Sequence, residues 1–178
     1  MIENKAQVLV VDDDPDICEV ISCALVDLED ENVEIITSNN PVEALEIIRT
    51  KNISVIVSDI KMPEMDGLAL GNEIRKFDND LPIIFVTGHQ ELCTITKALS
   101  LRTYDFILKP FDKNMIVKSV DNALRVRSRR IEELNLIRKI ENFMGISDES
   151  KAQKLNYRER ELYLDRLIEE LITRASKR

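Results

Sequence analysis

Acidic side chains follow two of the short apolar runs in this sequence. Three aspartates at positions 12–14 come directly after the apolar run at residues 8–11, and Asp59 comes two residues after the run at 55–57. Clustered carboxylates repel one another and raise each other's pKa unless a cation lies among them. Such an all-oxygen set, without histidine or cysteine, suits a hard cation such as Mg²⁺, which also keeps water and substrate phosphate in its coordination shell.

Two further runs are followed by side chains that can bind phosphate. Thr87 follows the run at 83–86, and Lys109 lies two residues after the run at 104–107. A lysine ammonium and a threonine hydroxyl can neutralise and hydrogen-bond phosphoryl oxygens, and a carboxylate held beside them can be the nucleophile that accepts the group. The residue types alone therefore indicate metal-assisted phosphoryl transfer onto an aspartate.

The apolar runs are the elements that must bring these residues together. They are short, rich in β-branched residues and mostly continuous, as expected of strands buried on both faces of a parallel sheet. They lie at residues 8–11, 33–36, 55–57, 83–86 and 104–107. Helix patterns separate them, at residues 15–29, 41–51, 67–77, 89–100 and from 112 onward.

Five strand–helix units predict an α/β fold with an open, doubly wound parallel sheet and right-handed crossovers. Pro15 and Pro41 fit the first turns of two helices, with Asp14 and Asn40 as the N-caps. Ligands of such sheets bind beyond the carboxyl ends of the strands. The fold therefore gathers the acids, the threonine and the lysine at one edge.

The motifs that contain these residues resemble those of a bacterial two-component response regulator receiver domain. The segments are VLVVDDDP at 8–15, SDIKMPEMDG at 58–67, VTG at 86–88 and FILKPF at 106–111. They occur in the order and at the spacing of the family, and the resemblance extends over residues 4–125. It implies a flavodoxin-like fold, with five parallel strands in the order 2-1-3-4-5.

By this resemblance, Asp59 is the phosphoacceptor and Mg²⁺ is the cofactor. Asp13 would hold the metal directly and Asp12 through water, together with Asp59 and the backbone carbonyl of Lys61. Asp14 follows this pair and precedes a proline, so helix capping is a stronger interpretation for it than metal binding.

The resemblance also assigns a switch. Thr87 and Lys109 would bind phosphoryl oxygens, and Phe106 occupies the family's aromatic switch position, which repacks when Thr87 moves. Phosphorylation adds about −1.5 to −2 charge units, which can bias such a two-state element. The alternative for Phe106 is an ordinary core residue.

Two further side chains could modulate the lifetime of the phosphoryl group by controlling the approach of water. By the resemblance these are Lys61, two residues after the phosphoacceptor, and His89, two residues after the switch threonine. The alternative for His89 is a solvated residue at the start of a helix. With one histidine and no paired cysteines, the sequence does not predict a zinc site.

Composition excludes several other classes of protein. The 178 residues include 25 basic and 33 acidic side chains and are 44% hydrophobic, which is typical of a globular protein rather than a disordered one. The sequence contains no apolar run long enough for a membrane span and no signal peptide pattern at its start. Three cysteines without metal-site spacing favour a reducing compartment, so we expect a cytoplasmic protein.

The charge and the helix pattern both divide the chain near residue 125. Residues 1–122 carry 23 acids and 11 bases, whereas residues 123–178 carry 10 acids and 14 bases. The pattern predicts a receiver domain at 1–125 and a helical extension at 126–178, in which the last receiver helix continues to Met144.

A loop near residues 145–155 and a second amphipathic helix are expected to complete the extension. Gly145 is a candidate C-cap, and Ser147 or Asn156 a candidate N-cap. The second helix carries an apolar stripe at spacings of four, three and four, formed by Leu164, Ile168, Leu171 and Ala175. We expect this extension to form homodimers, as a coiled coil or helical bundle, or else to fold back on the receiver.

The main functional prediction is a response regulator that takes a phosphoryl group from a histidine kinase or a histidine phosphotransfer protein. It would signal through protein–protein contacts or dimerisation of its tail, and it would not be an enzyme beyond slow self-dephosphorylation. One alternative is a phosphorelay shuttle that passes the group to a histidine phosphotransferase. Another is a DNA-binding transcriptional regulator, which a cluster of four arginines between residues 125 and 130 favours. The ten acids of the tail and the lack of a known DNA-binding motif argue against DNA as a partner.

Overall fold

A computed structural model of the chain describes residues 5–28, 32–88, 92–146, 155 and 157–175. The chain forms two compact units, Met1–Arg127 and Ser128–Arg178. Helix α5 contributes residues to both units. Among the described helices, none is both long enough and apolar enough to cross a membrane.

The first unit is built on a parallel sheet of five strands. The strand order is β2-β1-β3-β4-β5, and every neighbouring pair is parallel. This confirms the predicted doubly wound sheet and its order. The strands are β1 (Ala6–Val11), β2 (Val33–Ser38), β3 (Ile53–Ser58), β4 (Ile83–Thr87) and β5 (Asp105–Leu108).

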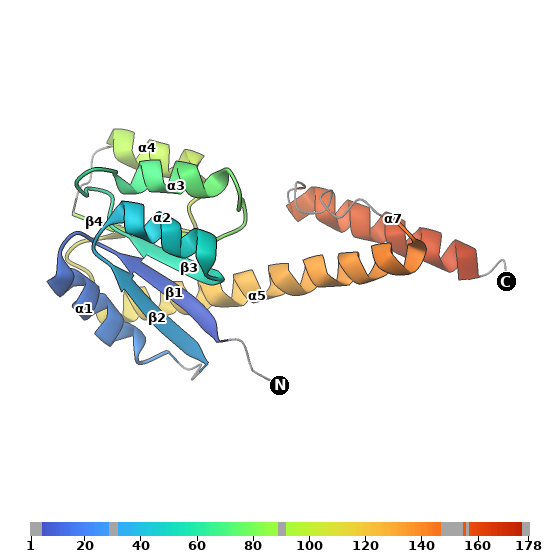
Figure 1. Ribbon diagram of the computed structural model, residues 1–178, viewed down its shortest axis with the longest axis horizontal. Coiled ribbons are helices and arrows are strands. Elements are labelled where there is room, and N and C mark those ends of the chain that lie inside the picture. The colour runs from blue at the N-terminus through green and yellow to red at the C-terminus, as the bar shows by residue number, and fades with distance from the viewer. Residues whose placement is uncertain (1–4, 29–31, 89–91, 147–154, 156, 176–178) are drawn as a thin grey trace. The chain divides into compact units, whose positions relative to one another are not determined.

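Helices cover both faces of this sheet (Figure 1). They are α1 (Pro15–Leu25), α2 (Pro41–Thr50), α3 (Gly67–Arg75), α4 (Leu92–Ser100) and α5 (Lys113–Met144). One core cluster joins the sheet to α1 and the first turns of α5, and a second joins it to α2, α3 and α4. Residues 8–11 of β1 alternate between the two clusters, which explains why this stretch is apolar at every position rather than at every second one.

Three helices begin at N-cap side chains in the loops that follow β1, β2 and β3. Asp14 accepts a hydrogen bond from the Asp16 backbone at the start of α1, and Asn40 caps α2. Both caps are as predicted, and capping is confirmed as the structural role of Asp14. A third cap, in which Asp66 accepts from the Ala69 amide at 2.6 Å, begins α3.

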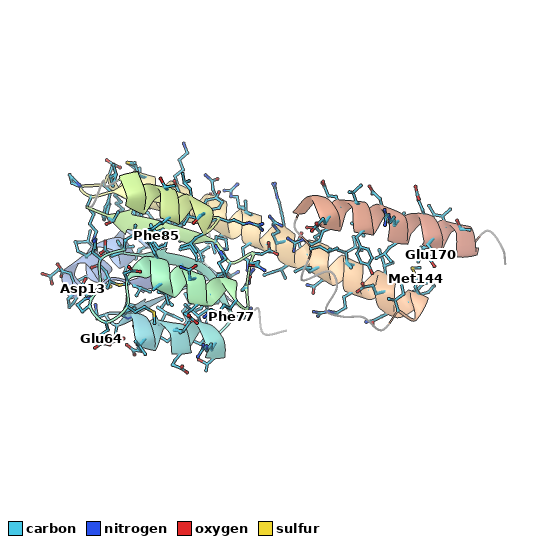
Figure 2. The ribbon with its side chains drawn as sticks, turned by 90° about the horizontal axis from the view of Figure 1, so that it is seen from above. Asp13, Glu64, Phe77, Phe85, Met144 and Glu170 are labelled. Atoms are coloured by element: carbon cyan, nitrogen blue, oxygen red, sulfur yellow. The ribbon has the colours of Figure 1, made fainter. Side chains whose placement is uncertain are left out.

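The second unit is a pair of helices, the distal half of α5 and α7 (Tyr157–Ala175). Figure 2 labels Met144 and Glu170 near the same end of the pair, so the helices run in the same direction. Their apolar side chains pack together around Ile137, Met144 and Leu167, each less than 10% exposed. Glu141 accepts a 2.7 Å hydrogen bond from the Tyr163 hydroxyl beside this cluster.

The predicted stripe of the second helix is partly wrong. Leu164 and Leu171 pack against the other helix, but Ile168 is exposed and Leu167 takes the buried position. The side chain of Ala175 and the candidate caps Ser147 and Asn156 lie outside the described residues. The helix pair therefore buries one seam within a single chain, although we expected the stripes of a lone pair to need a second copy or the receiver to cover them.

Candidate functional site

The carboxyl ends of the strands bring four predicted site residues together. Asp12 follows β1, Asp59 follows β3, Thr87 ends β4 and Lys109 follows β5. The first three are nearly inaccessible, with exposed fractions of 2%, 7% and 0%. The sheet order explains this meeting, because β1, β3 and β4 are neighbours and parallel strands end at the same edge.

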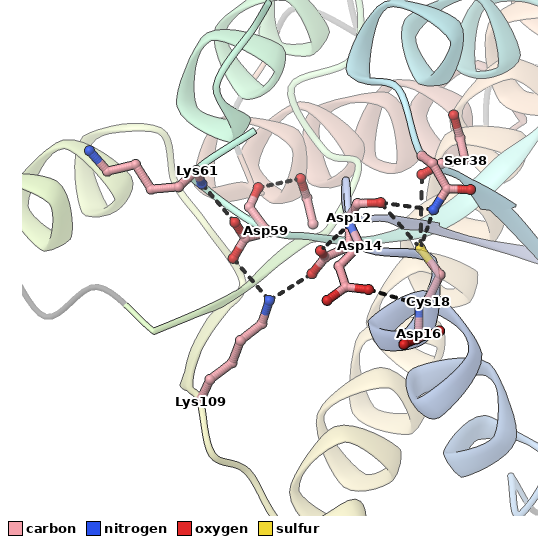
Figure 3. Close-up of polar contacts among 10 residues, drawn as sticks. Asp12, Asp14, Asp16, Cys18, Ser38, Asp59, Lys61 and Lys109 are labelled. Atoms are coloured by element: carbon pink, nitrogen blue, oxygen red, sulfur yellow. Dashed lines mark hydrogen bonds and ion pairs between the residues drawn. The ribbon is translucent and has the colours of Figure 1, made fainter. Parts of the chain in front are cut away.

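Lys109 joins the two buried carboxylates (Figure 3). Its ammonium nitrogen lies 2.7 Å from Oδ2 of Asp12 and 3.3 Å from Oδ1 of Asp59. The lysine side chain is only 24% exposed, so these ion pairs lie largely out of water. One cation thus balances part of the charge of two carboxylates at this edge.

Burial and the neighbouring charges shift the pKa values of Asp12 and Lys109 in opposite directions. Burial raises the pKa of Asp12; hydrogen bonds from Lys109 and from the Asp14 amide partly offset that rise. For Lys109, burial lowers the pKa, but the hydrogen bond to Asp12 and the charge of Asp59 outweigh burial and raise it overall. The site therefore keeps its lysine charged and holds one carboxylate that is costly to ionise.

Backbone contacts fix the position of Asp59. Its amide donates to the Val11 carbonyl at 2.8 Å, and its Oδ2 accepts from the Lys61 amide at 2.8 Å. Gly67 packs closely behind it, since a Cβ atom at that position would lie 2.1 Å from the Asp59 carbonyl oxygen. The glycine that ends the DxxMPxMDG motif is thus required by close backbone approach.

The residues fit a hard cation by their donor chemistry. Asp12 and Asp59 supply buried carboxylate oxygens, and Asp13 is an exposed carboxylate at the same strand end. In the described part of the chain, no three acidic, thiol or imidazole side chains form a ready metal centre. That is compatible with Mg²⁺, which is usually bound through one or two carboxylates and keeps several waters, rather than by a cage made of side chains alone.

The predicted switch residues take different positions. Thr87 is fully buried at the end of β4, and its carbonyl accepts a 2.9 Å hydrogen bond from the Lys109 amide. Phe106 is partly buried and packs against the core cluster shared with α2, α3 and α4. His89 lies outside the described residues. The structure thus places Thr87 beside Lys109 and Phe106 one strand away.

Asn39 is a residue that the sequence analysis did not single out. Its side-chain amide donates to the Asp12 carbonyl at 3.0 Å and to the Cys18 sulfur at 3.5 Å. No spacing rule marks it, because an asparagine before an N-cap is an ordinary loop residue. Burial raises the pKa of the Cys18 thiol, which keeps that side chain neutral beneath the site.

Comparisons with known proteins agree with this geometry. A family model described as the response regulator receiver domain matches residues 8–121. The C4-dicarboxylate transport transcriptional regulatory protein DctD of Pseudomonas aeruginosa is 35% identical over 135 residues, which are 75% of this chain and 28% of that protein. The probable transcriptional regulator ycf27 of Porphyra purpurea is 34% identical over 125 residues, 70% of this chain and 50% of that protein. The chain thus spans half or less of the length of these relatives.

Solved structures carry the same fold. A response regulator receiver domain protein from Clostridium thermocellum is 26% identical, with a TM-score of 0.62, and the match covers 69% of this chain and 97% of that one. The signal receiver domain of an HD domain-containing protein from Pseudomonas fluorescens has a TM-score of 0.67 at 22% identity, over 74% and 96% of the two chains. At 22% identity, the similarity to the Pseudomonas fluorescens domain shows a shared fold and no more.

Proposed function

Because this chain belongs to the response regulator receiver domain family of two-component signalling, we propose that Asp59 is its phosphoacceptor. The observation that carries the proposal is the position of this carboxylate, 7% exposed and 3.3 Å from the ammonium group of Lys109. A buried nucleophile beside a fixed cation suits the acceptance of a phosphoryl group, whose negative charge the cation offsets. The donor is a phosphohistidine of a histidine kinase or of a histidine phosphotransfer protein.

The transfer forms one bond and breaks one. An Asp59 carboxylate oxygen attacks the phosphorus, a P–O bond forms, and the P–N bond to the donor imidazole breaks. The bonding electron pair stays on the imidazole nitrogen, which takes one proton from solvent, so the histidine leaves as the neutral imidazole. Lys109 pairs with an oxygen of the new acyl phosphate, and the Thr87 hydroxyl donates to another.

Mg²⁺ is the proposed cofactor. Asp13 and Asp59 would hold it directly, Asp12 would hold it through water, and the Lys61 carbonyl would add a further oxygen. When bound, the ion would neutralise charge on the phosphoryl oxygens. The all-oxygen chemistry of this set supports Mg²⁺ over a softer metal.

Phosphorylation then acts as a switch. The added charge, about −1.5 to −2, draws the Thr87 hydroxyl toward the phosphoryl group, and Phe106 repacks into the space released. The partial burial of Phe106 supports this role, because such a side chain can adopt either an inward or an outward position. Lys61 and His89 would set the lifetime of the acyl phosphate by controlling the approach of water.

The output is proposed to come from the helical tail. Its helices leave large apolar side chains exposed, among them Leu136, Phe143, Leu162 and Ile172. A second copy of the chain would cover such a surface in a homodimer. We propose that the protein is cytoplasmic and that it catalyses no reaction on other molecules. Its own phosphoryl group would be lost only by slow self-dephosphorylation.

DNA binding is a second candidate because several relatives are described as transcriptional regulators. Against it, Arg127, one member of the arginine cluster, is 12% exposed and is paired with Asp78. Titration of a labelled DNA duplex at low salt distinguishes the two outputs. Binding that weakens steeply with salt would favour DNA binding as the output. No binding would favour protein–protein contacts as the output.

Intact-mass spectrometry after incubation with acetyl phosphate and Mg²⁺ tests the phosphoacceptor. We expect one added phosphoryl group on the wild-type chain, and none on Asp59→Ala or after chelation of the metal. An adduct of equal amount on Asp59→Ala would contradict the assignment.

A further inference from the structure

The backbone of Asp12 is held from three sides. Its amide donates to the Ser38 carbonyl at 3.3 Å, and its own carbonyl accepts from the Asn39 side-chain amide at 3.0 Å and from the Cys18 thiol at 3.5 Å. Figure 3 shows Cys18 and Ser38 beside Asp12, next to the carboxylate cluster. The loop after β2 thus contacts the residue that precedes the proposed metal ligand Asp13.

The asparagine bond is the stronger of the two on this carbonyl. A thiol is a weak donor, and 3.5 Å is a long contact, whereas an amide N–H at 3.0 Å is an ordinary hydrogen bond. A buried carbonyl that loses its main donor either remains poorly satisfied or rotates toward another. Asn39 is therefore the main donor that holds this carbonyl in its orientation.

The orientation of the Asp12 carbonyl affects the position of Asp13. The Asp12 carbonyl belongs to the planar peptide unit that ends at the Cα atom of Asp13, so its direction fixes where the Asp13 side chain starts. The Asp12 side chain is tied as well, because its Oδ1 accepts from the Asp14 amide at 3.0 Å. The hydrogen bond from Asn39 thus acts on the position of Asp13, while the Asp14 amide and Lys109 hold the Asp12 side chain.

We propose that Asn39 is a positioning residue for the Mg²⁺ site, an inference that rests on the proposed function above. It acts on the ligands through the peptide between Asp12 and Asp13 and does not contact the ion. Outer-shell partners of metal ligands typically contribute 10–100-fold to affinity. Asn39→Ala should therefore weaken Mg²⁺ binding by about tenfold.

Asn40→Ala is the matched control in the same loop. Asn40 caps α2 by accepting from the Val42 and Glu43 amides, and it has no contact with Asp12 among the hydrogen bonds of the described residues. Its replacement should lower the melting temperature of the metal-free protein and leave Mg²⁺ affinity within about twofold of the wild type. Asn39→Ala should show the larger loss of affinity.

Isothermal titration of the unphosphorylated full chain with MgCl₂ gives the affinities. Amide hydrogen exchange at Asp13 and Asp14 in the metal-free protein gives a second readout, which should be faster in Asn39→Ala and unchanged in Asn40→Ala. If the wild type binds Mg²⁺ and Asn39→Ala binds it with the same affinity, this inference alone is overturned. The same holds if Asn39→Ala and Asn40→Ala lose equal Mg²⁺ affinity. A wild-type chain that binds no Mg²⁺ would overturn the proposed cofactor and this inference together.

Discussion

The ammonium nitrogen of Lys109 lies 2.7 Å from Oδ2 of Asp12, although the two residues are 97 positions apart in the chain. The pair connects the ends of β1 and β5, which are not adjacent in the sheet. It also leaves Asp12 with a raised pKa, since burial outweighs the attraction of the lysine. The ionised carboxylate therefore costs stability when no metal is present.

Replacing this carboxylate should stabilise the metal-free protein at neutral pH. Asn in place of Asp12 removes the buried charge and keeps one side-chain oxygen. That oxygen can accept from the Asp14 amide, as Oδ1 does in the wild type, while the bond from Lys109 to Oδ2 is lost and Lys109 keeps its pairing with Asp59. We expect Asp12→Asn to raise the melting temperature by about 2–4 °C, the shift that about 1 kcal/mol produces in a chain of this size. Thermal denaturation followed by circular dichroism in chelator measures the change, and a lower melting temperature than the wild type would contradict it.

The same burial predicts a pH dependence. Because the folded-state pKa of Asp12 is raised, the folded protein binds more protons than the unfolded one between the ordinary aspartate pKa, about 3.9, and the raised value. This contribution to stability is full below that window and is lost as pH rises through it. Melting temperatures across this range should show the loss in the wild type and a flatter dependence in Asp12→Asn.

A methyl group at Gly67 should displace the phosphoacceptor. The added Cβ would lie 2.1 Å from the Asp59 carbonyl oxygen, which backbone atoms cannot accommodate without movement. We expect Gly67→Ala to cost about 3 kcal/mol or more in urea unfolding. Gly145→Ala is the contrasting variant, since Gly145 has φ +73° and no atom within 4 Å of the added Cβ. Its cost should be about 1–2 kcal/mol, from backbone conformation alone; equal costs for the two variants would disprove the packing argument.

Arg127 and Asp78 should be strongly coupled. Two guanidinium nitrogens donate to the two carboxylate oxygens at 3.3 and 2.6 Å, and the side chains are only 12% and 27% exposed. A double-mutant cycle with Arg127→Gln and Asp78→Asn should give a coupling of about 1.5–3 kcal/mol, as for hydrogen bonds to charged groups. The pair of Arg125, 61% exposed, with Asp121 is the control, for which less than about 1 kcal/mol is expected. Similar coupling energies for the two pairs would show that burial does not strengthen the pairing of Arg127 with Asp78.

The tail should drive dimerisation through its exposed apolar residues. Leu136 and Phe143 are 47% and 79% exposed, so glutamate at both positions should leave the helix pair folded and yield a monomer by light scattering. Leu167→Glu places a charge at a 3% exposed position and should instead reduce helix content. A double variant that remains dimeric would exclude this surface as the interface.

Much of the fold could be predicted because strand and motif patterns are local. Continuous apolar runs identified the strands, and proline with a preceding Asp14 or Asn40 identified two helix starts. The residues after the strands were correctly expected to meet, because parallel topology brings strand ends to one edge. Their roles in phosphoryl transfer remain predictions.

Side-chain contacts made by loop residues could not be predicted in the same way. The bond from Asn39 to the Asp12 carbonyl and the pair of Asp78 with Arg127 depend on three-dimensional approach and leave no spacing signature. The seam of the tail helices was missed for a related reason. Several apolar stripes are available on α7, and only packing against α5 selects Leu167 over Ile168.

Chemical trapping of the phosphorylated residue tests the central claim most directly. Borohydride reduction of the acyl phosphate after treatment with acetyl phosphate and Mg²⁺ converts the modified aspartate to homoserine, which peptide mass spectrometry locates. We expect the mass change on Asp59 alone. Homoserine at Asp12 or Asp13 instead, or an acid-stable phosphate on a hydroxyl group, would contradict the assignment of Asp59 as the phosphoacceptor.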